Sequence, residues 1–424
     1  MRNYYLSNCC WTRSRGALWV ISLLISLSVI AQPVLTREEV LAKYGLRDVS
    51  GVHSNWSKTV KGLPVISDLG LRTETNDLLF KSLDMQIRVG WNSRKERKAS
   101  KQWGYLVGQE RSLYLRVHRL ERVREVYRRM ILLYYSAHQM SRYDTLLGLL
   151  KQKEEIYQKM VAAGQSIDVE KWFDNQNDRR DAQLKHKEHE SMLRYLSGQF
   201  GLDNLTGIDP LFKHWISLDR MERLVFSKGR SFEQSPLLLL QNAKLDISRN
   251  EWKMAAAKQS NWLDFIQLKY STSKQFDFRK EVSIGANFNI PLAVLSRFDA
   301  EKARLKALEA QEKRQVFGEQ WTEEYQQAIY DFKHKLSNYR SYAGINEDIG
   351  MKRALGKYKT MPSIEPIVIL DIAIKVTNDR IKMGEMKRDV LLAYLKVLYL
   401  EGRLVQSPYR DYLSEDLVII STGN

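Results

Sequence analysis

The feature of this sequence that most constrains its fold is a long segment without helix breakers. No proline occurs between Pro64 and Pro210, and from Ala99 to Leu196 almost every residue favours a helix. A helix from Ala99 to Ala162 would be ~95 Å long at a rise of ~1.5 Å per residue. No compact domain has a core of that length. We therefore expect long antiparallel helices that pack sideways as a coiled coil or bundle.

The spacing of apolar residues in this segment supports the same expectation. They recur at three- and four-residue steps with arginines between them, which is the pattern of an amphipathic helix sustained over many turns. The stripe comprises Leu113, Leu115, Val117, Leu120, Val123, Val126, Tyr127, Met130 and Leu133. The whole chain has only 8 prolines and 22 glycines among 424 residues, so its composition also suits long solvated helices.

The first 31 residues have the pattern of a signal peptide. Three arginines and no acidic residue precede an apolar run from Ala17 to Ile30. The run is shorter than the ~20 residues that span a bilayer, so we expect cleavage after Ala31 rather than a membrane anchor. Cleavage would remove Cys9 and Cys10, the two cysteines of the chain, and leave a mature protein without a disulfide, a thiol nucleophile or a cysteine metal site.

The chain is strongly basic, with a formal net charge of +17 at pH 7. For an exported protein, anionic lipid headgroups or lipopolysaccharide are the expected acidic neighbours. The arginines Arg122, Arg124, Arg128 and Arg129 are not accompanied by an aromatic platform or a base-reading fold. We therefore expect no nucleic-acid partner and interpret these arginines as the solvated face of a helix.

Two short segments alternate between apolar and polar residues, which is the period of a strand. Each follows a shorter alternating run that would form a hairpin with it, at 69–73 and 266–270. The apolar positions are Leu83, Met85, Ile87, Val89 and Trp91 in the first segment and Val282, Ile284, Ala286, Phe288 and Ile290 in the second. Alternation alone leaves two interpretations open: a small soluble sheet, or strands of a transmembrane barrel, which are ~9–11 residues long and apolar toward lipid.

The chain repeats one plan: a helix, a hairpin, a long helix, a glycine-containing break and another helix. The breaks run from Ala163 to Val169 and from Met383 to Val390. In each, a glycine would end one helix and a following aspartate would cap the next. We predict a signal peptide at 1–31, a first repeat at 32–205, a connector at 206–235, a second repeat at 236–406 and a tail at 407–424.

These pieces resemble the TolC-like outer-membrane efflux protein family. The similarity is greatest from Pro236 to Leu336: Asn242–Ile247 looks like the family's helix before its second hairpin, Gly285–Leu292 like the strand that ends in an apolar-Pro-Leu turn, and Asp299–Arg304 like the helix that follows. The helix that begins at Thr36 is soon interrupted by glycines, and the first hairpin lacks the apolar-Pro-Leu exit. The resemblance is therefore that of a divergent member.

The resemblance implies a mainly α fold with a small β part. Three identical subunits would each give four strands to a 12-stranded barrel in the outer membrane of a Gram-negative bacterium, and long antiparallel coiled-coil helices would form a duct through the periplasm. It implies no enzyme activity and no cofactor. The duct would passively export substrates, in an efflux or type I secretion system, that an inner-membrane pump and a periplasmic adaptor deliver.

By motif position, the resemblance assigns candidate residues to the two breaks. Asp168 and Asp389 match the aspartates near the constriction of the duct, where a ring of carboxylates would discriminate ions by charge. The residues expected to meet the adaptor are Gly164, Gln165, Ser166, Gly384, Glu385, Lys387 and Arg388.

Other interpretations stay open beside this one. Both aspartates could simply cap helices, and Lys387 and Arg388 could simply be solvated. A periplasmic helical scaffold or adaptor without a barrel is the alternative function. His186 and His189 share a helix face, but no third metal ligand accompanies them, and we expect no metal site. No glycine-rich phosphate loop or hydrolase motif is present.

Overall fold

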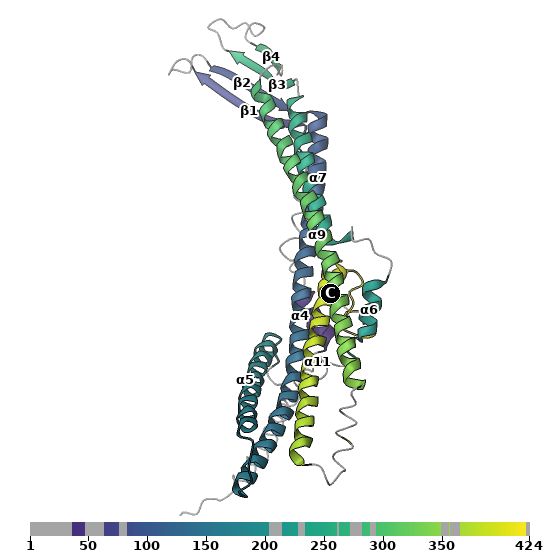
Figure 1. Ribbon diagram of the computed structural model, residues 1–424. Helices are drawn as coiled ribbons and strands as arrows, with labels where there is room; N and C mark the ends of the chain where they lie inside the picture. The colour runs from purple at the N-terminus through teal and green to yellow at the C-terminus, as the bar shows by residue number, and fades with distance from the viewer. Residues whose placement is uncertain are drawn as a thin grey trace, which may run out of the picture.

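The computed structural model describes residues 36–46, 63–75, 83–202, 214–227, 234–260, 263–271, 282–288, 294–348, 356 and 365–420. Figure 1 shows an elongated molecule in which a small sheet lies at one end of a set of long helices. The elements are α2 (Arg37–Val40), η1 (Leu41–Gly45), β1 (Ile66–Thr75), β2 (Leu83–Trp91), α4 (Arg94–Ala162), α5 (Val169–Gln199), α6 (Leu218–Phe226), α7 (Pro236–Gln259), β3 (Leu263–Ser271), β4 (Val282–Phe288), α9 (Val294–Asp348), α11 (Pro366–Leu400) and η6 (Arg403–Val405). The expected mainly α fold with a small β part is confirmed.

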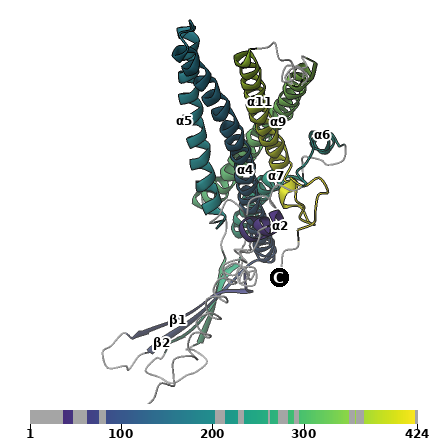
Figure 2. The same cartoon turned by 90° about the horizontal axis from the view of Figure 1, so that it is seen from below.

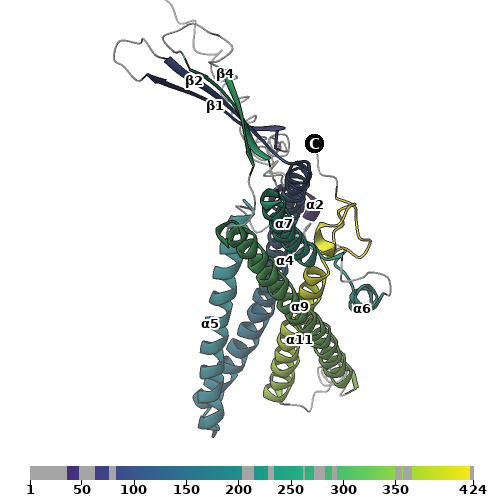
Figure 3. The ribbon, with the colours of Figure 1, turned by 90° about the horizontal axis from the view of Figure 1, so that it is seen from above.

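Helix α4 is the longest element and the axis on which the others pack. Its 69 residues correspond to ~100 Å at ~1.5 Å per residue, as the absence of prolines predicts. The helix begins where the Ser93 hydroxyl accepts a hydrogen bond from the Glu96 N–H at 3.1 Å. It contacts α7, α11 and α5. Figures 2 and 3 show α4 with α5 as one pair and α9 with α11 as a second, and the pairs diverge away from the sheet.

The hydrophobic core lies at the middle of the molecule, not at the sheet. The apolar stripe of α4 meets the C-terminal half of α11 there, together with part of α9 and the C-terminal tail. Tyr127 and Tyr394 are fully buried at its centre. Their hydroxyls donate to the carbonyls of Arg410 at 3.1 Å and Tyr412 at 3.3 Å, so both helices hold the tail by its backbone.

A buried ion pair joins the two ends of the described chain at this core. Arg37 Nε lies 2.8 Å from Asp411 Oδ2, and both side chains are almost fully buried. Arg37 is held by α2, which begins with a capping box in which Thr36 and Glu39 bond reciprocally. Burial raises the pKa of Asp411, and the positive charge of Arg37 opposes that shift only in part.

The part of the chain that the structure describes contains no helix that is both long enough and apolar enough to cross a membrane. The predicted signal peptide, residues 1–31, lies outside the described residues.

Removing one member of the buried pair should cost more than removing both. We expect Asp411→Asn to lower the free energy of unfolding by about 3 kcal/mol, because it leaves the Arg37 charge buried without a counter-ion. The double variant Arg37→Met with Asp411→Leu should be less destabilised than this single variant. Thermal and denaturant unfolding of the mature protein would measure both. Glu188→Gln, in the exposed pair with Lys185, is the matched control and should change stability by less than about 1 kcal/mol. Equal losses in Asp411→Asn and the control would contradict this account.

Candidate functional site

The four strands form one antiparallel sheet in the order β1-β2-β3-β4. The register aligns the alternating residues of both hairpins. Leu71 pairs with Ile87, Ile87 with Leu268, and Leu268 with Ile284, so one apolar row crosses the whole sheet. A parallel row contains Leu69, Val89, Ile266 and Ala286. One face of the sheet is therefore apolar, because side chains alternate faces along each strand.

The apolar face is open to its surroundings. Leu71 is 65% exposed, Ile284 77% and Leu268 41%. Figure 1 shows the sheet projecting beyond the helices, with no described helix over either face. A contiguous exposed apolar face of this kind marks a site of contact with a membrane or with another protein. In the single chain, no described element of the protein covers this apolar face.

The opposite face is polar. Arg72 pairs with Gln86, Gln86 with Lys269, and Lys269 with Ser283 across the four strands. Lys269 Nζ also forms an ion pair with Asp84 Oδ2 at 3.2 Å. The sheet therefore separates an apolar surface from a charged one, as the alternation predicts.

The predicted strand residues fall where the alternation places them, with small differences in extent. β2 runs from Leu83 to Trp91 and includes Met85, Ile87 and Val89. β4 runs from Val282 to Phe288 and includes Ile284 and Ala286. Ile290 lies outside the described residues.

The first predicted break is a tight turn at the end of α4 that is remote from the sheet. Gly164 adopts φ +68°, a left-handed conformation that favours glycine, and Gln165 N–H donates to the Met160 carbonyl at 3.0 Å. Ser166 completes the loop. Asp168 then caps α5: its Oδ1 accepts from the Lys171 N–H at 3.3 Å. The predicted turn and the capping interpretation are confirmed.

Asp168 is exposed and carries its charge at this tip. Its other carboxylate oxygen pairs with Lys171 Nζ at 3.1 Å. The side-chain and backbone hydrogen bonds from Lys171 lower the pKa of Asp168, so the carboxylate stays ionised well below neutral pH.

The second predicted break, at Gly384, is wrong. Helix α11 continues without interruption from Pro366 to Leu400. A glycine inside a helix costs only about 1 kcal/mol, and the burial of α11 against α4 and α9 outweighs that cost. Residues 349–364, apart from Gly356, lie outside the description, and the connection between α9 and α11 runs through them.

Gly384 allows close approach of α4 instead. A Cβ at this position would lie 2.7 Å from Gln139 Nε2 and closer still to Arg142 Nη1. Both side chains reach the backbone of α11: Gln139 Nε2 donates to the Ile381 carbonyl at 2.8 Å, and Arg142 Nη1 donates to the Arg380 carbonyl at 2.6 Å. Gly384, which we predicted to end a helix, lies instead at a packing contact between α4 and α11.

The residues that follow Gly384 therefore lie along the side of α4, not at a tip. Lys387 Nζ lies 5.5 Å from the ring centroid of Tyr134 on α4. Arg388 Nη2 pairs with Asp389 Oδ1 at 2.7 Å. Glu385 is likewise an interior residue of α11. The placement of Gly384, Glu385, Lys387, Arg388 and Asp389 at a hairpin tip is corrected accordingly.

His186 and His189 contact other side chains of the protein. His186 Nε2 lies 2.9 Å from Asp144 Oδ1. His189 stacks on Tyr143 with ring centroids 5.6 Å apart and meets Tyr135 edge-on, and burial lowers the pKa of His189. Among the described residues, no group of three histidine, cysteine or acidic side chains is arranged to hold a metal ion.

Alanine substitution should have opposite effects at a glycine packed against another helix and at a glycine with open space around it. We expect Gly384→Ala to destabilise the protein by about 1 kcal/mol or more, because the methyl group displaces Gln139 and Arg142 from the α11 carbonyls they bond. The matched control is Gly148→Ala on α4, where a Cβ meets no atom within 4 Å. There the helix preference of alanine should stabilise by up to about 1 kcal/mol. Thermal unfolding measures both, and equal effects of the two substitutions would refute the packing role of Gly384.

No protein-family model matches this sequence, and no curated protein matches it significantly. Solved structures are similar in fold. VceC, an outer membrane protein of Vibrio cholerae, is 11% identical, with a TM-score of 0.58 over 91% of this chain and 96% of that chain. CusC, whose crystal structures concern folding and transmembrane channel formation, is 12% identical, with a TM-score of 0.57 over 90% and 92%. A membrane protein from Pseudomonas aeruginosa is 12% identical, with a TM-score of 0.55 over 79% and 80%. The chain therefore has the fold of these three membrane proteins, at 11–12% sequence identity.

Proposed function

We propose that this protein is an outer-membrane channel that exports substrates and catalyses no reaction. The observation that carries the proposal is the sheet: one face is apolar and open, the other is polar, and both lie at one end of helices ~100 Å long. In a bilayer the apolar face would meet lipid and the polar face would line a water-filled lumen. The structural neighbours support this placement by their fold.

The sheet needs other copies to become a pore. Among the described residues, the outer strands β1 and β4 each have one edge without a neighbouring strand, and a strand edge with unpaired backbone groups does not occur in lipid. Closure with further copies would remove both edges. Three copies with four strands each would give a 12-stranded barrel, within the range of known bacterial barrels. β1, β2 and β3 have 10, 9 and 9 residues, close to the ~9–11 that cross a bilayer.

The helices also carry surfaces that fit contact with copies of the chain. Large apolar side chains stand exposed along α5 and α9, including Phe173 at 58% and Leu305 at 60%. Their burial between neighbouring subunits would stabilise a trimer and close the helices into a periplasmic duct. The turn at Gly164, Gln165 and Ser166 would then lie at the far end of the duct.

We assign that far end to partner contact. Substrates would come from an inner-membrane pump through a periplasmic adaptor that meets this turn, and three copies of Asp168 would form an acidic ring beside it. This assignment rests on the turn at Gly164 alone, because Asp389 and its neighbours lie in the interior of α11. The alternative, a periplasmic scaffold or adaptor, would have to cover the apolar face of the sheet in some other way.

A charge on each face of the sheet tests the membrane placement. Leu268→Arg puts a guanidinium on the apolar face, and we expect it to cost ~2–4 kcal/mol of membrane stability and to deplete the protein from the outer-membrane fraction. Gln267→Arg, one residue away in β3 but on the polar face, is the matched control. It should insert normally and alter conductance in planar bilayers. If the wild-type protein and both variants stay in the soluble periplasmic fraction, the channel proposal fails and the scaffold alternative is supported.

Asp168 can be tested without disturbing its helix. Asp168→Asn keeps a side chain that caps helices as well as aspartate does but removes the charge. We expect reduced cation selectivity in the reconstituted channel, measured as a smaller reversal potential in a salt gradient. In the wild type, selectivity should persist down to about pH 5, because the carboxyl has a lowered pKa and stays ionised there. An unchanged reversal potential in the variant would remove Asp168 from the conduction path.

A further inference from the structure

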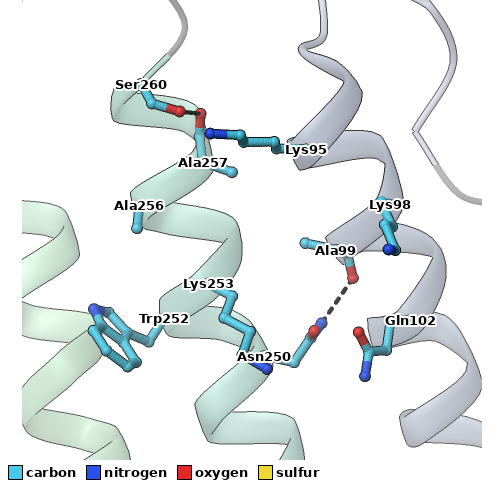
Figure 4. A pocket seen from close by; sticks show the side chains of 10 residues that line it. All are labelled: Lys95, Lys98, Ala99, Gln102, Asn250, Trp252, Lys253, Ala256, Ala257 and Ser260. Atoms are coloured by element: carbon cyan, nitrogen blue, oxygen red, sulfur yellow. Dashed lines mark hydrogen bonds between the residues drawn. The ribbon is translucent and has the colours of Figure 1, made fainter.

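A cavity of about 650 Å³ lies between α4 and α7, next to the sheet. Its lining comes from the first turns of α4, which begins just after β2, and from the last turns of α7, which ends just before β3. Figure 4 shows side chains from both helices around it: Lys95, Lys98, Ala99, Gln102, Asn250, Trp252, Lys253, Ala256, Ala257 and Ser260.

The cavity is positively charged. Lys95, Lys98 and Lys253 line it, and none of the ten lining residues is acidic. Within the described part of the chain, no ion pair is formed by any of these lysines. Glu251, which precedes Trp252 on α7, accepts a hydrogen bond from Trp103 Nε1 at 3.3 Å and is not part of the lining. The N-terminal end of α4 adds its helix dipole, which also favours an anion.

Asn250 provides a second, independent indication of a ligand. Its side chain is only 2% exposed, and its Nδ2 donates to the Ala99 carbonyl at 2.7 Å. That bond fixes the amide orientation and leaves Oδ1 buried without a hydrogen-bond partner. An unpaired buried acceptor costs about 1–3 kcal/mol, so an occupant that donates a hydrogen bond here would be stabilised. Three exposed lysines alone could be ordinary solvated charges. Solvated lysines do not, however, account for the unpaired oxygen of Asn250.

We propose that the cavity binds the headgroup of an anionic glycerophospholipid. The lysines would pair with the phosphate, and a headgroup hydroxyl would donate to Asn250 Oδ1. The lipid source rests on the proposed function, because the cavity then lies where the barrel passes into the periplasmic helices, at the level of the inner-leaflet headgroups. Trp91, at the end of β2, and Trp252, on the cavity wall, are partly exposed at this level, where membrane proteins concentrate tryptophan. The site would fix the depth of each subunit in the bilayer.

Native mass spectrometry of the mature protein in detergent tests the site. We expect phosphatidylglycerol to bind more tightly than phosphatidylcholine, and the variant Lys98→Gln with Lys253→Gln to bind phosphatidylglycerol at least about tenfold more weakly. The matched control is Lys302→Gln with Lys306→Gln, two exposed lysines of α9, which also starts beside the sheet. It should retain wild-type binding. Equal losses in both variants, or no preference for phosphatidylglycerol, would overturn the proposal.

Soluble probes distinguish the source of the phosphate. Inorganic phosphate and glycerol 1-phosphate, followed by phosphorus NMR, should bind far more weakly than the lipid. Tight, lysine-dependent binding of either probe without lipid binding would overturn the lipid assignment. Conductance of the Lys98 and Lys253 variant separates this proposal from the channel itself: normal conductance with unchanged lipid affinity sinks the headgroup site alone. A wild-type chain that forms no pore would count against the channel instead.

Discussion

The stability of α4 comes mainly from side-chain burial distributed along its 69 residues, because in proteins the packing of an apolar face contributes more to helix stability than backbone propensity does. Its partners divide that length. α7 covers the part next to the sheet, α11 the middle and α5 the part that leads to the turn at Gly164. The core at the middle of the molecule, around Tyr127 and Tyr394, is the place where most of these elements meet. The sheet contributes no residue to this core and lies beyond it, at one end of the helices.

The single chain leaves apolar surface exposed at the sheet and along two of its helices. The sheet exposes its apolar face, and α5 and α9 expose large apolar side chains along their length. Covering such apolar surface with lipid or protein is favourable, because it removes the surface from water. The membrane at one end and the identical subunits along the sides that we propose would meet both requirements at once, and the polar face and the charged tip would then border water.

Local patterns predicted most of this architecture. The missing prolines gave the length of α4, the alternation gave both faces of the sheet, and the glycine and aspartate of 164–168 gave the first tip. Each of these signals acts between residues that are near in sequence. Gly384 could not be interpreted the same way, because its role depends on Gln139 and Arg142 of a different helix. The Arg37–Asp411 pair and the unpaired Asn250 amide are also long-range features, which no local pattern contains.

In the proposed channel, one face of the sheet meets lipid and the other meets water. Residues 32–424 contain no cysteine, so single cysteines at positions 267 and 268 can each carry a spin label in the reconstituted protein. Collision rates with molecular oxygen, which concentrates in lipid, and with a water-soluble nickel chelate then report the environment of each face. We expect collisions with oxygen to dominate at position 268 and collisions with the nickel chelate to dominate at position 267. Equal access of the nickel chelate to both positions would contradict this expectation.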